Sequence, residues 1–199
     1  MGKKTTTVIV AGVGGQGILL ASNLLSEAAM EAGYDVKKSE IHGMSQRGGD
    51  VISTVRFGEK VYSPIVGLGE ADVILAFEKL EAMRNLPYLK KEGMVIVNDY
   101  RIDPLPVASG DMEYPEGIIE FLKERVKTIA LDARDLAEKA GNIRTMNVVL
   151  LGVLSKNLDI PEEIWLQVIE RRVPPKAIEA NKVAFRLGRE VAEKAFAGA

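Results

Sequence analysis

Apolar side chains recur with two different periods along this chain. Short, nearly continuous apolar runs predict strands, and longer stretches with an apolar residue every third or fourth position predict helices. The predicted strands cover residues 7–11, 35–40, 51–57, 72–77, 94–98 and 128–131. The predicted helices cover residues 16–32, 78–86, a segment that ends near 124, 133–140, 146–154, a segment that begins at 161, and a last helix with Ile178, Val183, Leu187 and Val191 on one face.

The alternation of strands and helices predicts an α/β fold. We expect three layers, α/β/α, around a mostly parallel, Rossmann-like sheet, because the run at residues 72–77 is continuously apolar, as in a strand that is buried on both faces. The length of 199 residues suits a single domain that spans 1–199. Within it we expect a sheet core over about 1–142 and a helical part over about 143–199.

One strand and three connections carry more specific expectations. The polar segment at 35–40 suits an edge strand. Residues 57–61 predict a tight turn into a returning strand, and Gly93 predicts a turn before the strand at 94–98. The stretch 103–115, rich in proline and glycine, is a predicted connection that can hold a short edge strand.

The composition narrows the possible chemistry. The chain has no cysteine and one histidine, which excludes a disulfide framework, a thiolate nucleophile, a cysteine-ligated zinc or iron–sulfur site and a histidine-rich metal site. The net charge of −2, without a long basic run, argues against nucleic acid as a partner. The chain shows no signal-peptide pattern and no run of the ~20 apolar residues that a membrane span needs, so we expect a cytoplasmic protein without membrane contact.

A first glycine loop lies between the strand at 7–11 and the following helix. It satisfies the spacing G-x-G-x-x-G. Such glycines allow a tight turn and let backbone N–H groups face an anion at a helix N-terminus. A close strand–helix turn that needs glycine only for packing explains the same pattern. The residues of this loop are Gly12, Gly14, Gly15, Gln16 and Gly17.

A second segment, residues 40–49, holds the only histidine together with an arginine, a serine and three glycines. Adjacent glycines disfavour a helix and the segment lacks apolar alternation, so we expect a loop, of the kind that often binds ligands or partners. No nucleophile stands at a recognisable elbow, and we therefore expect His42 to orient a ligand rather than to transfer protons. Arg47 is the stronger candidate, because a guanidinium binds carboxylate or phosphate bidentately. An ion pair of Arg47 with Glu40 or Asp50 is the structural alternative.

Three charged residues follow the apolar run at 72–77. Glu78 stands at the C-terminal end of a predicted strand, where α/β sheets bind their ligands. Glu81 and Arg84 have the i,i+3 spacing of a salt bridge, which we expect to be solvated.

The order of several motifs is informative as a set. These are Gly12-Val-Gly-Gly-Gln-Gly17, His42-Gly-Met-Ser-Gln-Arg-Gly-Gly49, Val55-Arg56, Ser63-Pro64, Ala71-Asp72 and Glu78…Glu81-Ala-Met-Arg84. Together they resemble the gamma-type subunit of 2-oxoacid:ferredoxin oxidoreductases, and within that family the small subunits of the indolepyruvate type. The resemblance is close over residues 7–98 and looser beyond, and the second loop is its most specific part.

The resemblance implies a subunit of an enzyme complex, inactive when isolated, that contributes no catalytic residue and binds no metal. A large partner subunit would carry thiamine diphosphate, Mg²⁺ and [4Fe-4S] clusters. The complex would convert indolepyruvate or another arylpyruvate, with CoA, to acyl-CoA, CO₂ and reduced ferredoxin. This chain would assist assembly of the hetero-oligomer and position substrate and CoA. Its expected ligand or interface contacts are Gly12, Gly14, Gly15, Gln16, Gly17, His42, Gly43, Ser45, Gln46, Arg47, Gly48 and Gly49.

Two other classes of function stay open from the residues alone. One is a standalone NAD(P)-dependent dehydrogenase, although its fingerprint requires an acidic residue at the end of a hydrophobic second strand, and only Glu40 stands near that place. The other is an adaptor that binds a nucleotide through the first glycine loop.

Overall fold

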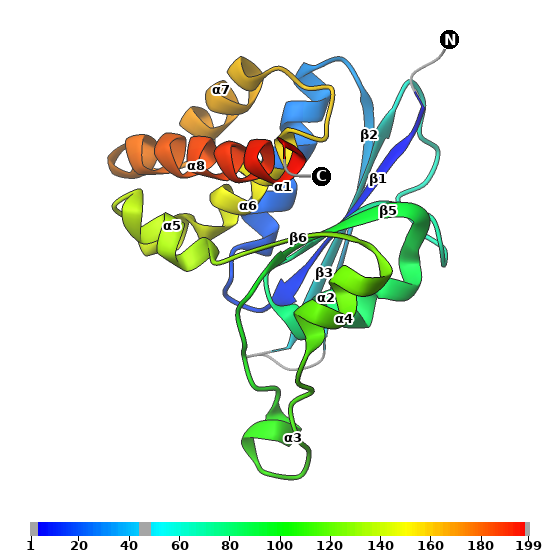
Figure 1. Ribbon diagram of the computed structural model, residues 1–199. Coiled ribbons are helices and arrows are strands. Elements are labelled where there is room, and N and C mark those ends of the chain that lie inside the picture. Colours follow the sequence, from blue (N-terminus) through cyan, green and yellow to red (C-terminus); the bar gives the residue numbers. More distant parts are fainter. Residues whose placement is uncertain (1–3, 44–48, 198–199) are drawn as a thin grey trace.

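One sheet of six strands organises the part of the chain that the structure, a computed structural model, describes: residues 4–43 and 49–197 (Figure 1). The strand order is β2-β3-β1-β4-β5-β6. Among these strands β3 alone runs against the others, since it pairs antiparallel with β1 and β2 while the remaining pairs are parallel. The expected mostly parallel α/β sheet is therefore confirmed. The strands are β1 (Thr6–Val13), β2 (Asp35–His42), β3 (Asp50–Gly58), β4 (Ala71–Ala76), β5 (Leu89–Asn98) and β6 (Lys127–Leu131).

Helices cover both faces of this sheet. In Figure 1, α2 and α4 lie on one side, and α1 and α5 to α8 lie on the other. The α-helices are α1 (Ile18–Glu31), α2 (Lys79–Asn85), α3 (Leu105–Ala108), α4 (Ile118–Arg125), α5 (Ala133–Lys139), α6 (Met146–Ser155), α7 (Glu162–Arg172) and α8 (Ile178–Ala197), with short 3-10 turns at Leu86–Tyr88, Ile143–Thr145 and Pro175–Ala177.

Strand β1 shows how the apolar sequence builds two cores. Successive side chains of a strand point to opposite faces. Val8 and Val10 enter the core beneath α1 and α6, whereas Ile9 and Ala11 enter the core beneath α2 and α4. The three layers expected from the sequence follow from this alternation.

The almost wholly apolar helix α6 lies at the centre of the larger core, and nine of its ten residues are buried. It packs closely against α8 because a glycine on each helix removes the side chains at the crossing. A Cβ atom on Gly152 would lie 3.0 Å from the Gly188 Cα atom and inside van der Waals contact with the Phe185 carbonyl. Trp165 of α7 and Phe185 of α8 stack nearby, with ring centroids 5.7 Å apart.

The prediction of a returning strand after residues 57–61 is wrong, because no strand is present between Gly58 and Ala71. Residues 59–70 instead form neither a helix nor a strand, and two side chains of β3 bind this segment. Thr54 Oγ1 donates to the Pro64 carbonyl at 2.9 Å, and Arg56 Nη1 donates to the Ile65 carbonyl at 2.5 Å. These donors satisfy carbonyls that a partner strand would otherwise have to bind.

Several predicted boundaries also change. Strand β2 continues through His42, so the first residues expected in the second loop are strand, as the edge position allows. Strand β5 begins at Leu89, before the turn expected at Gly93. The connection over 103–115 contains the short helix α3 where a short edge strand was considered. On α8, Val183 faces solvent, and the buried stripe is Asn181, Ala184, Phe185, Gly188 and Ala192.

Within the described residues no helix is long and apolar enough to cross a bilayer. The division into a sheet core over 1–142 and a helical part over 143–199 stays a prediction.

The contact between α6 and α8 can be tested with Gly152→Ala. Alanine favours a helix over glycine by about 1 kcal/mol, yet the crossing has no space for a methyl group. We expect a net loss of about 1–3 kcal/mol in the free energy of unfolding, measured by urea denaturation. Val183→Ala on the exposed face of α8 serves as control and should change it by less than about 0.5 kcal/mol. A neutral or stabilising Gly152→Ala would contradict the close crossing.

Candidate functional site

The first glycine loop forms a tight turn from β1 into α1, and two of its glycines adopt left-handed backbone conformations. Gly15 has φ +98° and Gly17, the N-cap of α1, has φ +82°. Gly12 is required for a different reason, because a Cβ atom there would lie 2.8 Å from Gln16 Oε1 and 2.9 Å from Phe77 Cβ. The turn is therefore shaped by both backbone conformation and close packing.

Gln16 uses both ends of its side-chain amide inside the protein. Its Oε1 accepts a hydrogen bond from the Val13 N–H at 2.7 Å, and its Nε2 donates to the Phe77 carbonyl at 3.0 Å. The expected ligand contact of Gln16 stays a prediction, while these bonds give it a role in tying the turn to the end of β4.

Asn147 is a residue of this site that the sequence interpretation missed. It is buried in the first turn of α6, where its Nδ2 donates to the Gly17 carbonyl at 3.4 Å and its Oδ1 accepts from the Val148 N–H at 3.0 Å. A Cβ atom on Gly17 would lie 2.7 Å from Asn147 Nδ2. A lone amide in an otherwise apolar run was the available signal.

The turn opens into a cleft of about 350 Å³. Its lining residues are Gly14, Gly15, Gly17, Ile18, Leu19, His42 and Val51. The first N–H groups of a helix have no partners within the helix and carry a partial positive charge. Here the first turn of α1 has no acidic residue, and among the described residues no side chain caps the N-terminus of this helix, which begins after Gly17. The cleft can therefore accept an anion.

The two glycine-containing segments that the sequence singled out meet at this cleft. The Gly14 N–H donates to the Gly49 carbonyl at 2.9 Å, and the Gly43 N–H donates to the Asp50 carbonyl at 2.8 Å. His42, half exposed at the end of β2, lies at the rim with its Nε2 3.8 Å from Glu40 Oε2. Thus Gly14, Gly15, Gly17 and His42 share one cleft, with Gly12 and Gln16 behind it. Met44, Ser45, Gln46, Arg47 and Gly48 lie outside the described residues.

Glu78 and Glu81 both have partners within the chain. Glu78 is buried and caps α2 by accepting the Glu81 N–H at 3.0 Å. The pair of Glu81 with Arg84 is present at 2.6 Å, but the expectation that it is solvated is wrong, since Glu81 is only 3% exposed. Burial raises the pKa of the Glu81 carboxyl above its ordinary value, and Arg84 opposes that rise.

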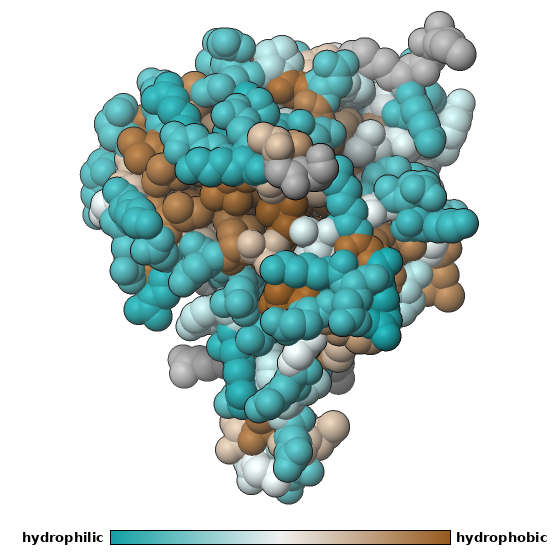
Figure 2. Space-filling view, in the orientation of Figure 1, coloured by the Kyte–Doolittle hydropathy of each residue, from teal (hydrophilic) through white to brown (hydrophobic). Residues whose placement is uncertain are grey.

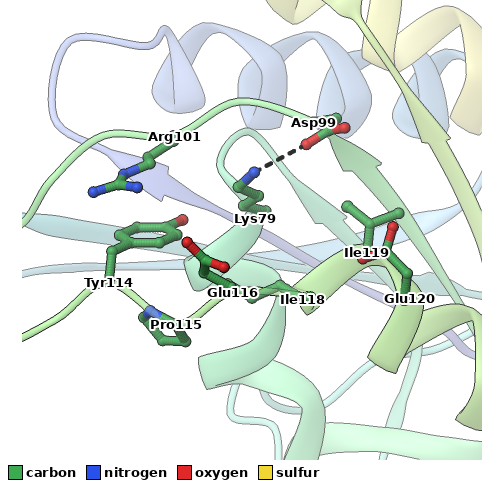
Figure 3. A pocket seen from close by; sticks show the side chains of 10 residues that line it. Lys79, Asp99, Arg101, Tyr114, Pro115, Glu116, Ile118, Ile119 and Glu120 are labelled. Atoms are coloured by element: carbon green, nitrogen blue, oxygen red, sulfur yellow. Dashed lines mark hydrogen bonds and ion pairs between the residues drawn. The ribbon is translucent and has the colours of Figure 1, made fainter.

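A second cavity, of about 270 Å³, lies near Glu78 (Figure 3). Two cations line it, and both already face carboxylates: Lys79 Nζ lies 3.2 Å from Asp99, and Arg101 Nε lies 2.6 Å from Asp103. Because these charges are paired within the chain, the cavity is less suited to a charged ligand than the cleft at α1.

The topology disfavours a nicotinamide dinucleotide. That fingerprint places its acidic residue on the strand beside β1. Here the antiparallel strand β3 lies between β1 and β2, so Glu40 is two strands from β1, roughly 10 Å away, and pairs with Lys38. The described ranges contain no group of three His, Asp or Glu side chains that could hold a metal ion.

A comparison with protein families shows which family this chain belongs to. The family described as pyruvate ferredoxin/flavodoxin oxidoreductase matches residues 7–191. The chain belongs to this family. It is a small subunit of a 2-oxoacid:ferredoxin oxidoreductase, and the resemblance inferred from the motifs is confirmed.

Two named relatives align with nearly the whole of this chain. The indolepyruvate oxidoreductase subunit IorB of Thermococcus kodakarensis is 49% identical over 96% of this chain and 98% of its own length. The corresponding subunit of Pyrococcus horikoshii is 48% identical over 96% of this chain and 98% of its length.

Two solved members of the family share the fold. The gamma subunit of a keto/oxoacid ferredoxin oxidoreductase from Geobacter sulfurreducens has a TM-score of 0.71 and 25% identity, over 95% of this chain and 99% of its own. The 2-oxoglutarate:ferredoxin oxidoreductase of Magnetococcus marinus, solved with 2-oxoglutarate, coenzyme A and succinyl-CoA bound, has a TM-score of 0.76 and 26% identity. This match covers 96% of the present chain but 32% of that chain, which therefore extends well beyond the matched part.

The structural role of Gln16 can be tested with Gln16→Leu, which keeps the size of the side chain but removes both hydrogen bonds. We expect the free energy of unfolding to fall by about 1–3 kcal/mol in urea denaturation. Gln167→Leu, on the exposed face of α7, is the matched control and should be nearly neutral. An unchanged stability of Gln16→Leu would mean that the amide is free for a ligand.

Proposed function

We propose that this chain is the small subunit of an indolepyruvate-type ferredoxin oxidoreductase and that it positions coenzyme A at the cleft of α1. The complex would convert an arylpyruvate, CoA and oxidised ferredoxin to acyl-CoA, CO₂ and reduced ferredoxin. The high identity to two indolepyruvate oxidoreductase subunits over nearly their full lengths supports the substrate class. A cytoplasmic location is part of the same proposal.

The observation that carries the proposal is the uncapped N-terminus of α1 inside a cleft between the two loops. Coenzyme A carries phosphate groups, and phosphates bind at helix N-termini that follow glycine-rich turns. The left-handed Gly15 and Gly17 allow the backbone to approach such a group closely. The bound coenzyme A of the Magnetococcus marinus relative shows that an enzyme of this family uses that ligand.

In this proposal the chain's own residues bind and orient but do not react. N–H groups at the start of α1 donate to phosphate oxygens, and His42 at the rim orients the ligand. Gly43, Ser45, Gln46, Arg47, Gly48 and Gly49 of the second loop complete the contacts with ligand or partner. The larger subunit would carry thiamine diphosphate with Mg²⁺, which supplies the decarboxylation chemistry, and [4Fe-4S] clusters, whose thiolate ligands this cysteine-free chain cannot provide.

The division of roles predicts how activity depends on this chain. Isolated, the chain should reduce no ferredoxin. Co-expressed with its thiamine-binding partner, it should form a stable complex that reduces ferredoxin with indolepyruvate and CoA at least about 100-fold faster than the partner alone, since misplaced reactants cost about that factor. Pyruvate and 2-oxoglutarate are the comparison substrates. Equal turnover with and without this chain would rule the proposal out.

Coenzyme A binding at α1 predicts a specific effect of charge at Leu19, which lines the cleft and is 39% exposed. Leu19→Glu should raise the KM for CoA about tenfold at low salt, corresponding to ~1.4 kcal/mol of repulsion, and less at high salt. An acidic residue in the first turn favours the helix, so the fold should be preserved.

Leu19→Gln provides a neutral side chain of the same length and should leave the KM for CoA near that of the wild type. The KM for indolepyruvate should not separate the two variants. If the glutamate and glutamine variants had the same KM for CoA, the phosphates would bind elsewhere.

A further inference from the structure

Residues 99–117, which we call the arm, connect β5 to α4 and extend beyond the sheet (Figure 1). The arm leaves β5 at its C-terminal end. Because β1, β4 and β5 are parallel, this is the edge of the sheet at which the first glycine loop also lies. The arm contains α3, and its end folds on itself: the Gly110 N–H donates to the Val107 carbonyl at 3.0 Å and the Met112 N–H to the Pro106 carbonyl at 3.0 Å.

The base of the arm is fastened by the buried carboxylate of Glu78. Its Oε1 accepts hydrogen bonds from both limbs of the arm, from the Ile102 N–H at 3.3 Å on the outgoing limb and from the Tyr114 hydroxyl on the returning limb. Figure 3 shows Arg101 over the ring of Tyr114, with its guanidinium carbon 4.3 Å from the centroid. A buried carboxylate is costly unless hydrogen bonds satisfy it, so Glu78 holds the two limbs in a fixed relation.

The end of the arm exposes large apolar side chains. Leu105 is 81% exposed and Met112 is 63% exposed. Figure 2 shows apolar atoms at the end of the arm, among polar ones. The arm is also acidic, with five carboxylates, at residues 99, 103, 111, 113 and 116, against one guanidinium, that of Arg101, which gives a net charge of −4. A surface that receives this arm needs an apolar pocket with a basic rim.

We propose that the arm docks the larger, cofactor-bearing subunit, with Leu105 and Met112 inserted in such a pocket. This inference rests on the proposed function, which requires that subunit. Two features favour it over a second copy of this chain. The arm and the cleft lie at the same edge of the sheet, so a partner that completes the cleft also meets the arm. They are linked through adjacent residues, because the Phe77 carbonyl binds Gln16 while the Glu78 carboxylate binds the arm.

The test compares the binding of this full-length chain and its variants to the purified thiamine- and iron–sulfur-containing subunit. The double variant Leu105→Ser, Met112→Ser should weaken the complex by about 30-fold or more, as expected for central apolar anchors. Its melting temperature should not fall, because both side chains are already exposed. Met30→Ser is the matched control: Met30 is 52% exposed on α1, away from the arm, and its loss should change binding less than about twofold.

A second variant tests the fastening of the arm with its end intact. Tyr114→Phe removes the hydroxyl that binds Glu78 but keeps the ring beneath Arg101. Trypsin should then cleave at Arg101 at least about fivefold faster, and binding to the larger subunit should weaken although Leu105 and Met112 are present. Binding should also weaken with added NaCl, since the acidic arm faces a basic rim.

The outcomes separate the two proposals. If the wild-type chain binds the larger subunit and the double variant binds equally well, the arm proposal is overturned and the proposed function stands. If the wild-type chain does not bind the larger subunit at all, both are overturned. If the double variant instead dissolves a dimer of this chain and leaves the larger complex intact, the arm is a self-association element and the proposal is wrong.

Discussion

The end of strand β4 holds the carboxyl edge of the sheet together. The Phe77 N–H donates to the Ala11 carbonyl of β1 at 2.8 Å, and the Phe77 carbonyl accepts from Gln16 at 3.0 Å and from Asn98 Nδ2 at 3.3 Å. The adjacent Glu78 caps α2 and binds both limbs of the arm. Two neighbouring residues thus connect β1, the first glycine loop, the end of β5 and the arm. The cleft and the arm depend on this one junction.

The sequence could predict those parts of the fold whose signal is local. Strands β1 and β4 and helix α6 follow from apolar runs whose burial is evident locally, and the glycine spacing located the turn. The prediction of a strand after residues 57–61 failed for a reason that the segment itself does not contain. The side chains of Thr54 and Arg56 donate to carbonyls of this segment that a neighbouring strand would otherwise bind. Helix α3 has four residues, which is too short for helical periodicity to appear.

The sequence located the two glycine loops but not the contacts that hold their residues in place. Residues of both glycine loops were expected to contact a ligand or a partner, and in the structure the Gly14 N–H donates to the Gly49 carbonyl. The structural tasks of Gln16 and Asn147 depend on partners 61 and 130 residues away, which no local pattern contains. Glu81 carried an ordinary surface spacing with Arg84, yet tertiary packing buried it. Burial of a charged residue is decided by the layer that covers it, which only the assembled fold reveals.

A subunit that binds and orients a ligand, as proposed for this chain, contributes shape, backbone donors and fixed side chains. Preorganisation determines how well it does so, because ordering a loop on association costs free energy that a rigid loop does not lose. In this chain the buried Glu78 keeps the arm ordered. Gln16 keeps the glycine turn ordered through its hydrogen bond to the carbonyl of Phe77, the residue before Glu78. Burying the Glu78 carboxylate costs free energy. In return, the arm and the cleft already have a fixed relative position before a partner binds. A loosened junction would misplace the arm and the cleft together, which makes the end of β4 the constraint on both.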